Sequence, residues 1–147
     1  MIYENPHRRY NPLTREWLLV SPHRTKRPWQ GQVEKVAENN LTPYDSACYL
    51  CPTNERSGGI VNPVYDSTFV FENDFAALYP NVEPSEIAEN DLFIAKSERG
   101  ICRVICFSPN HSLTLAKMET AEIKEVVDVW QSQTMELSEQ DFIKSVQ

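Results

Sequence analysis

Residues 48–59, around which the chain is organised, read Cys48-Tyr49-Leu50-Cys51-Pro52-Thr53-Asn54-Glu55-Arg56-Ser57-Gly58-Gly59. The proline and the two glycines disfavour a helix here. Two thiolates on a tight turn can occupy adjacent corners of the tetrahedron that zinc prefers. A redox Cys-x-x-Cys pair instead needs a stabilised thiolate, usually at a helix N-terminus. Metal binding is therefore the leading interpretation, and an inert pair of loop cysteines or a redox pair are the alternatives.

The other ligands of such a metal must come from elsewhere in the chain, and histidine is the residue type that most often joins cysteine around zinc. The sequence contains three histidines, His7, His23 and His111. His111 is the one outside the basic N-terminal arm, and it lies just after the strand predicted over residues 100–107. A residue at the end of a strand has an ordered backbone that can hold a metal ligand in place. The alternative is that His111 is only a solvent-exposed side chain, as single loop histidines usually are. His111 is therefore the candidate third ligand.

Composition limits the classes of function. The 147 residues are 41% hydrophobic and 24% charged, which is typical of about one globular domain. The chain has no apolar run near the ~20 residues that a membrane helix needs, so we expect no membrane partner. The N-terminal residues lack the apolar segment of a secretory signal, which predicts a cytoplasmic location with reduced thiols.

Charge is unevenly distributed along the chain. Residues 1–30 carry six Lys and Arg against two Glu, a net +4 out of a total of −7, which leaves −11 for the rest. A basic arm on an acidic body indicates a local anion site rather than a nucleic-acid surface. Arg24 and Arg27 lie in a short loop after a predicted strand, where guanidinium groups can reach phosphate oxygens. The alternative is a solvated basic arm.

Apolar runs predict an α+β fold, a mostly antiparallel sheet with a packed C-terminal helix. Residues 81–98 are interpreted as an acidic, mobile loop, and residues 142–147 as the start of a further strand. The helix is expected from Thr120, as N-cap, to about Leu137. The predicted strands are residues 16–20, 68–71, 75–79 and 100–107. The helix stripe predicted to be core is Ile123, Val126, Val127, Trp130 and Leu137.

Two further features have competing interpretations. Cys102 and Cys106 are four residues apart on one predicted strand, roughly 13 Å, which is too far for a disulfide or a shared metal. They are predicted to be small buried hydrophobes. Asn73 and Asp74 lie between two predicted aromatic strands. They form either a simple turn or an amide and a carboxylate presented to the hydroxyls of a ligand.

Several strings together carry a family resemblance. They are Pro6-His7-Arg8-Arg9-Tyr10-Asn11-Pro12-Leu13-Thr14, Val20-Ser21-Pro22-His23-Arg24, Lys26-Arg27-Pro28-Trp29-Gln30-Gly31, Cys48-Tyr49-Leu50-Cys51, Phe69-Val70-Phe71, Asn73-Asp74-Phe75-Ala76-Ala77-Leu78, Cys102-Arg103-Val104-Ile105-Cys106-Phe107-Ser108-Pro109 and Trp130-Gln131-x-Gln133. In this order they resemble the N-terminal portion of galactose-1-phosphate uridylyltransferase, in the class that belongs to the histidine-triad superfamily. The resemblance covers nearly the whole chain.

The resemblance implies a reaction and a set of partners. The family converts UDP-glucose and galactose 1-phosphate into glucose 1-phosphate and UDP-galactose through a uridylyl-histidine intermediate, which splits one displacement into two. The full-length family is expected to form homodimers. The implied site residues are Cys48, Cys51 and His111 as zinc ligands, Arg24 and Arg27 at the phosphates, and Ser57, Asn73 and Asp74 at the uridine. The implied segments are residues 1–32 as basic arm with the first strand, 33–63 as cysteine loop, and 64–147 as strands and helix.

The sequence departs from the family in one respect. The family's nucleophile lies in a His-Pro-His motif, and no His-x-His occurs before the end at Gln147. We therefore assign no catalytic residue. The chain is expected to be an incomplete half of a histidine-triad-like domain that is inactive alone. The alternative is a non-catalytic, zinc-stabilised module that binds a uridine nucleotide.

Overall fold

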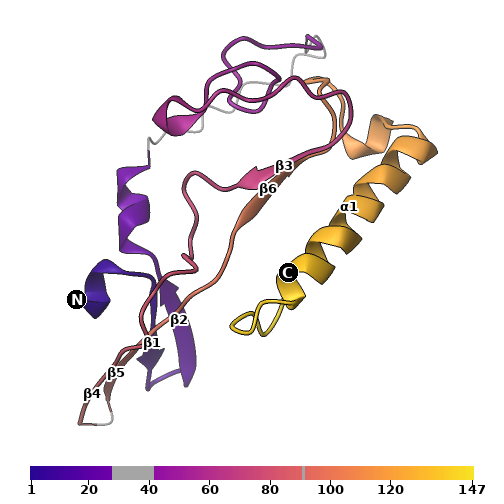
Figure 1. Cartoon of the computed structure of the whole chain (residues 1–147). Coiled ribbons are helices and arrows are strands. Elements are labelled where there is room, and N and C mark those ends of the chain that lie inside the picture. The colour runs from indigo at the N-terminus through magenta and orange to yellow at the C-terminus, as the bar shows by residue number, and fades with distance from the viewer. Residues whose placement is uncertain (28–41, 91) are drawn as a thin grey trace. The chain divides into compact units, whose positions relative to one another are not determined.

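The computed structural model describes residues 1–27, 42–90 and 92–147 (Figure 1). The Pro28-Trp29-Gln30-Gly31 part of the family resemblance lies outside these residues. None of the helices in the described ranges combines the length and the apolarity that crossing a bilayer requires.

The chain forms two compact units, and each is built from two separate stretches of sequence. The first unit comprises Met1–Gln30 and Phe75–Cys102. The second unit comprises Gly31–Asp74 and Arg103–Gln147, and it contains the cysteine pair and His111.

The first unit contains a four-stranded antiparallel sheet in the order β2-β1-β5-β4. Its central strand β1 pairs His7 with Val20 of β2 on one side and with Ser97 of β5 on the other. The prediction of a strand over residues 16–20 is confirmed. The strands are β1 (His7–Asn11), β2 (Glu16–Val20), β4 (Glu86–Glu89) and β5 (Phe93–Ser97).

Strand β1 is absent from the strands predicted from sequence, because its residues are polar or charged apart from Tyr10. The fully buried His7 explains how such a strand becomes central. Its Nδ1 donates to the carbonyl of Asn5 at 2.8 Å, and its Nε2 accepts from Nε of Arg9 at 3.0 Å. Both ring nitrogens are thus used in local hydrogen bonds, which stabilises a buried imidazole.

The prediction of a mobile acidic loop over residues 81–98 is wrong. Glu86–Glu89 and Phe93–Ser97 are instead the paired strands β4 and β5, in which Glu86 pairs with Lys96. The side chains of this pair also form an ion pair at 3.0 Å. Acidic residues are therefore compatible with this edge strand, because their side chains remain in solvent and the backbone makes the ladder.

The prediction of a strand over residues 75–79 is also wrong. Its backbone carbonyls bind side chains instead of a strand partner. Ser21 Oγ donates to the carbonyl of Ala77 at 2.7 Å, and His23 Nε2 donates to the carbonyl of Ala76 at 2.6 Å. The apolar run is therefore a bent segment whose buried member is Ala76.

The second unit contains a two-stranded antiparallel pair, β3 (Phe69–Glu72) and β6 (Arg103–Cys106). Phe69 pairs with Cys106 and Glu72 pairs with Arg103. The predicted strands near 69 and 103 are confirmed, but they pair with each other and do not join a single sheet with β2, contrary to the expectation. The predicted strand over residues 100–107 is also shorter than expected. The short 3-10 helices in the part of the chain that the structure describes are η1 (Ile2–Glu4), η2 (Pro22–Lys26), η3 (Ser57–Gly59) and η4 (Leu115–Lys117).

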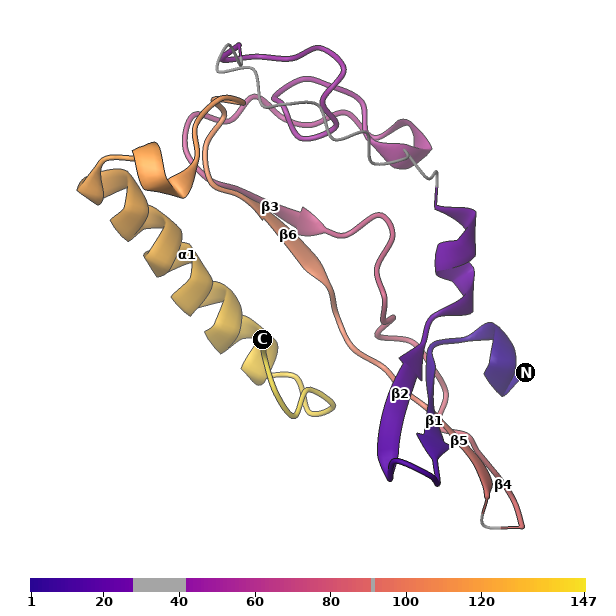
Figure 2. The same cartoon turned by 180° about the vertical axis from the view of Figure 1, so that it is seen from behind.

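Helix α1 (Thr120–Ser138) lies alongside the β3–β6 pair in both views (Figures 1 and 2). The helix prediction is confirmed, with Glu119 rather than Thr120 as the N-cap residue. Arg103 connects β6 to α1, because its two Nη atoms donate to Gln133 at 2.5 Å and to Glu136 at 2.7 Å. This guanidinium lowers the pKa of the Glu136 carboxyl.

The predicted core stripe of α1 is only partly buried. Val126 is fully buried and Leu137 is 9% exposed, but Ile123, Val127 and Trp130 are between 36% and 46% exposed. Helical periodicity identified an apolar face but not the elements that cover it.

The remaining predictions for the second unit are mixed. Residues 142–147 form no strand, because the chain turns back there with Ile143 N donating to the carbonyl of Gln140 at 2.9 Å. Cys106 is buried as predicted, whereas Cys102, which ends the first unit, is partly exposed.

Candidate functional site

The described part of the cysteine loop, residues 42–63, is shaped by consecutive turns. Cys48 N donates to the carbonyl of Asp45 at 3.1 Å, and Cys51 N donates to the carbonyl of Cys48 at 3.3 Å. The backbone N–H of Leu50 also donates to Cys48 Sγ at 3.4 Å. These turns place the two cysteines on one side of a compact knuckle, as the Cys-x-x-Cys spacing predicts.

Two asparagine side chains fix the conformation of this loop. Asn54 Nδ2 donates to the carbonyls of Asp45 and Cys48, both at 2.8 Å. Asn62 is 3% exposed, and its Nδ2 donates to the carbonyls of Tyr49 and Cys51 at 2.8 and 3.0 Å. Asn54 thus gives a second donor to carbonyls that the turns already use, and both side-chain amides tie neighbouring turns together, which makes the loop a defined scaffold.

His111 reaches the loop from the segment that follows β6. Its backbone N–H donates to the carbonyl of Pro43 at 2.8 Å, which fastens it to the start of the cysteine loop. The preceding Asn110 accepts at Oδ1 from the backbone N–H of Ser112 at 3.0 Å. This turn holds the histidine backbone on both sides.

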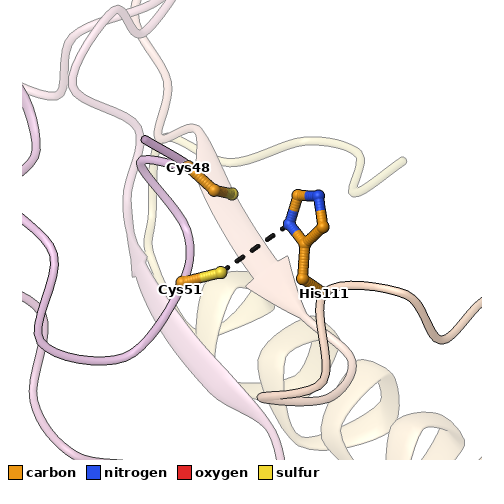
Figure 3. Close-up of side chains that lie close together, drawn as sticks. All are labelled: Cys48, Cys51 and His111. Carbon is orange, nitrogen blue, oxygen red and sulfur yellow. Dashed lines mark hydrogen bonds between the residues drawn. The ribbon is translucent and has the colours of Figure 1, made fainter. Parts of the chain in front are cut away.

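The ligand atoms of Cys48, Cys51 and His111 converge (Figure 3). All three lie within 4.8 Å of one another, and Cys51 Sγ lies 3.7 Å from His111 Nδ1. Ligands around a tetrahedral zinc ion are separated by about 3.5–3.8 Å. Two thiols and an imidazole are a donor set for soft or borderline divalent metals. The cluster could therefore hold a metal ion.

The protonation of Cys51 bears on the redox alternative. Burial raises the pKa of the Cys51 thiol, and the neighbouring Cys48 raises it further. A redox-active cysteine needs the opposite, a lowered pKa that favours the thiolate. The raised pKa of Cys51 therefore disfavours dithiol redox activity, whereas it is compatible with metal binding, because a metal ion replaces the proton of a buried thiol.

Tyr65 and Cys106 border the cluster, a placement that the sequence does not predict. Tyr65 donates its hydroxyl proton to the carbonyl of Leu50, between the two cysteines, at 2.5 Å. Burial raises the pKa values of Tyr65 and Cys106, so both keep their protons. Tyr65 thus acts as a structural donor behind the metal cluster.

The residues expected at the uridine lie on two segments of the second unit. Ser57 is exposed and begins η3, whose Gly58 has a positive φ of 77°. Asn73 and Asp74 directly follow β3. Asp74 is not a free carboxylate, because its Oδ1 accepts from Nη1 of Arg56 at 2.6 Å.

Arg24 and Arg27, the residues expected at the phosphates, belong to the first unit. Arg24 lies in η2 and Arg27 follows it, and both are exposed. The neighbouring His23 fixes this helix by its bond to Ala76 and by contact with the Tyr79 ring, 4.3 Å between centroids. The two arginines are thus presented to solvent from an anchored turn.

Comparison with known proteins gives consistent relatives. The family model described as the N-terminal domain of galactose-1-phosphate uridyl transferase matches residues 1–147. The galactose-1-phosphate uridylyltransferase of Haemophilus influenzae is 54% identical over 134 residues, covering 91% of this chain and 38% of the relative. The enzymes of that name from Saccharomyces cerevisiae and Rattus norvegicus are 48% and 47% identical, over 90% and 93% of this chain.

This chain therefore spans well under half the length of these relatives, 38% of the yeast protein and 36% of the rat protein. Two solved structures are also similar. A uridylyltransferase structure matches with a TM-score of 0.55 and 27% identity, over 88% of this chain and 37% of that one. A uridylyltransferase mutant matches in fold with a TM-score of 0.61 and 20% identity, over 92% of this chain and 35% of that one.

Proposed function

Because the chain belongs to the galactose-1-phosphate uridylyltransferase family, we propose that it supplies the metal-binding and uridine-binding part of a nucleotidyltransferase. The reaction would exchange UMP between UDP-glucose and galactose 1-phosphate. The convergence of Cys48, Cys51 and His111 is the observation that carries this proposal, because the resemblance names these residues together and His111 lies 60 residues after Cys51 in sequence. A homodimer and a cytoplasmic location belong to the same proposal.

The proposed metal is zinc. Two thiols and an imidazole match its preference for tetrahedral sulfur and nitrogen ligands. Zinc bound here would cross-link the cysteine loop to the segment after β6, and its role would be to hold the loop in one conformation. The loop and Asp74 are in direct contact through Arg56, so a fixed loop supports a fixed uridine site.

The proposed substrate contacts follow from charge and hydrogen-bonding capacity. Arg24 and Arg27 would bind the phosphates of the UDP-sugar through their guanidinium groups. Asn73 and Asp74 would bind the uridine end, with Ser57 lining the nucleotide pocket. An amide pairs with a pyrimidine edge and a carboxylate accepts from hydroxyls.

Each of the three histidines already has another role. His7 is buried with both nitrogens hydrogen-bonded, His23 donates to the carbonyl of Ala76, and His111 faces Cys51. None is a candidate nucleophile. This observation favours the second candidate function for the 147 residues by themselves, a zinc-stabilised module that binds a uridine nucleotide without transferring it.

We expect the zinc-loaded chain to bind UDP-glucose and to catalyse no measurable uridylyl transfer. Titration calorimetry measures the binding, and a radiolabelled UDP-glucose assay measures the transfer. ADP-glucose, which carries the wrong base, should bind at least about 10-fold more weakly, because its base cannot make the same hydrogen bonds.

An Asp74→Asn variant should weaken UDP-glucose binding about 10-fold, through loss of a charged acceptor. Asp128→Asn is its matched control, because Asp128 is exposed on α1 and pairs with Lys124.

Equal binding of UDP-glucose and ADP-glucose by the wild-type chain would refute uridine recognition. Turnover would show that one of the three histidines is a nucleophile after all.

A further inference from the structure

Arg56 is a charged residue that neither the sequence patterns nor the proposed substrate contacts assign. Its side chain is 8% exposed, and an arginine is rarely buried to this extent unless it is paired. It lies in the cysteine loop five positions after Cys51, and its backbone N–H donates to the carbonyl of Ile60 at 2.7 Å. The loop therefore fixes the point from which this side chain extends.

Two contacts fix the guanidinium group itself. Its central carbon lies 3.9 Å from the centroid of the Phe71 ring, within the range of a cation–π contact. Its Nη1 donates to Asp74 Oδ1 at 2.6 Å, the length of a charge-assisted hydrogen bond. Phe71 lies on β3 and Asp74 lies just after it, so Arg56 spans from the cysteine loop to the end of this strand.

The environment of this ion pair separates it from an ordinary surface pair. The side chains of Arg56 and Asp74 are 8% and 19% exposed, whereas exposed pairs contribute little because solvent screens them. Nε of Arg56 is buried without a hydrogen-bond partner among the described residues, so this position of the guanidinium leaves one of its own donors unsatisfied. The contact that this position does provide is the hydrogen bond to Oδ1 of Asp74, which orients that carboxylate.

A carboxylate has acceptor capacity for about four hydrogen bonds. The pair with Arg56 uses Oδ1 and leaves capacity at Asp74 for donors of a ligand. Vicinal hydroxyl groups, as on a ribose, are donors that a fixed carboxylate can accept from together. An unpaired carboxylate on a loop would first have to be ordered, at a cost in conformational entropy.

We propose that Arg56 is a positioning residue for ribose recognition, holding the Asp74 carboxylate in the orientation that accepts from the ribose hydroxyls. The inference rests on the proposed uridine binding at Asp74. Lysine cannot replace Arg56 fully, because a lysine ammonium lacks the planar fork that stacks on Phe71 and donates to Asp74 at the same time.

The test compares UMP with 2′,3′-dideoxy-UMP, which lacks the ribose hydroxyls, by titration calorimetry on the zinc-loaded chain. Wild type should prefer UMP about 10- to 100-fold, the value of hydrogen bonds to a charged group. In Arg56→Gln this preference should fall to about 3-fold or less, because the carboxylate is no longer oriented. Arg15→Gln, at an exposed arginine in the turn before β2, should keep the wild-type preference.

A purely structural role for Arg56 would weaken both ligands by the same factor and leave the preference unchanged, which would overturn the inference. Adding Asp74→Asn to Arg56→Gln should not reduce the preference further. If Arg56→Gln does not fold, as judged by circular dichroism, Arg56→Lys decides, and an undiminished preference there overturns the inference. If the wild-type chain binds UMP and 2′,3′-dideoxy-UMP equally well, this inference alone is overturned. If the wild-type chain binds no UMP, the proposed function is overturned as well.

Discussion

Replacing Cys51 with alanine is expected to weaken zinc binding on the order of 100- to 1000-fold, because one of three protein ligands is lost. Cys51 is 3% exposed and its Sγ lies 3.7 Å from His111 Nδ1, so its thiol is the buried sulfur ligand beside the imidazole. Titration against a chromogenic chelator measures the affinity of purified protein for zinc.

The matched control is Cys102→Ala, which removes a partly exposed cysteine outside the metal cluster. It should retain wild-type zinc affinity. Thermal denaturation gives an independent measurement, because zinc that binds only the folded state raises the Tm. That increase should be present in Cys102→Ala and absent in Cys51→Ala. Equal zinc affinity in the two variants would contradict the ligand assignment.

Zinc affinity is also expected to rise with pH, by about two log units per pH unit between pH 7 and 8, because two thiols must each release a proton. Burial raises the pKa of Cys51 above its ordinary 9.0, so the metal-free site holds a proton that competes with zinc. Zinc affinity rises with pH because low pH favours the protonated, metal-free site and high pH favours the zinc-bound site.

In Cys51→Ala the slope of zinc affinity against pH should fall to about one log unit per pH unit, because one thiol remains.

The folding stability of the metal-free protein should change with pH in the opposite direction and fall as the pH rises. A raised pKa contributes stability that is complete below pH 9.0 and is lost as the pH rises through the folded-state value. A zinc affinity that is independent of pH would indicate that zinc binding releases no proton from a thiol.

The convergence of Cys48, Cys51 and His111 could be anticipated from sequence because the cysteine turn is local and its candidate partners are few. The Cys-x-x-Cys spacing specifies a chelating turn, and three histidines leave a short search for the third ligand. The asparagines that hold the loop, Asn54 and Asn62, could not be anticipated. Their role depends on which carbonyls the folded loop brings within reach of the two side-chain amides, and residue type alone does not reveal this.

Arg56 was missed for a related reason. Its contacts with Phe71 and Asp74 depend on how the cysteine loop lies against β3, at separations of 15 and 18 residues. The one available signal was a single arginine in a loop otherwise rich in small and polar residues. Such a residue is unremarkable in sequence and becomes informative only when its side chain is found buried.

The fold shows which sequence signals are strong. Helix α1 was predicted because nineteen residues combine helical periodicity with an acidic first turn. The β4–β5 hairpin was missed because its acidic residues outweighed the short apolar run of Phe93, Ile94 and Ala95. Strand β1 was missed because burial of His7 depends on hydrogen bonds to Asn5 and Arg9, which no hydrophobic pattern reports.

The central claim is that two thiolates and one imidazole of this chain bind a single zinc ion. X-ray absorption spectroscopy at the zinc edge tests it most directly, because the method reports the ligand elements and their distances. We predict two sulfur atoms at about 2.3 Å and at least one nitrogen at about 2.0 Å, with an imidazole scattering pattern that disappears in His111→Ala. A first shell of oxygen and nitrogen alone, without sulfur, would contradict the account.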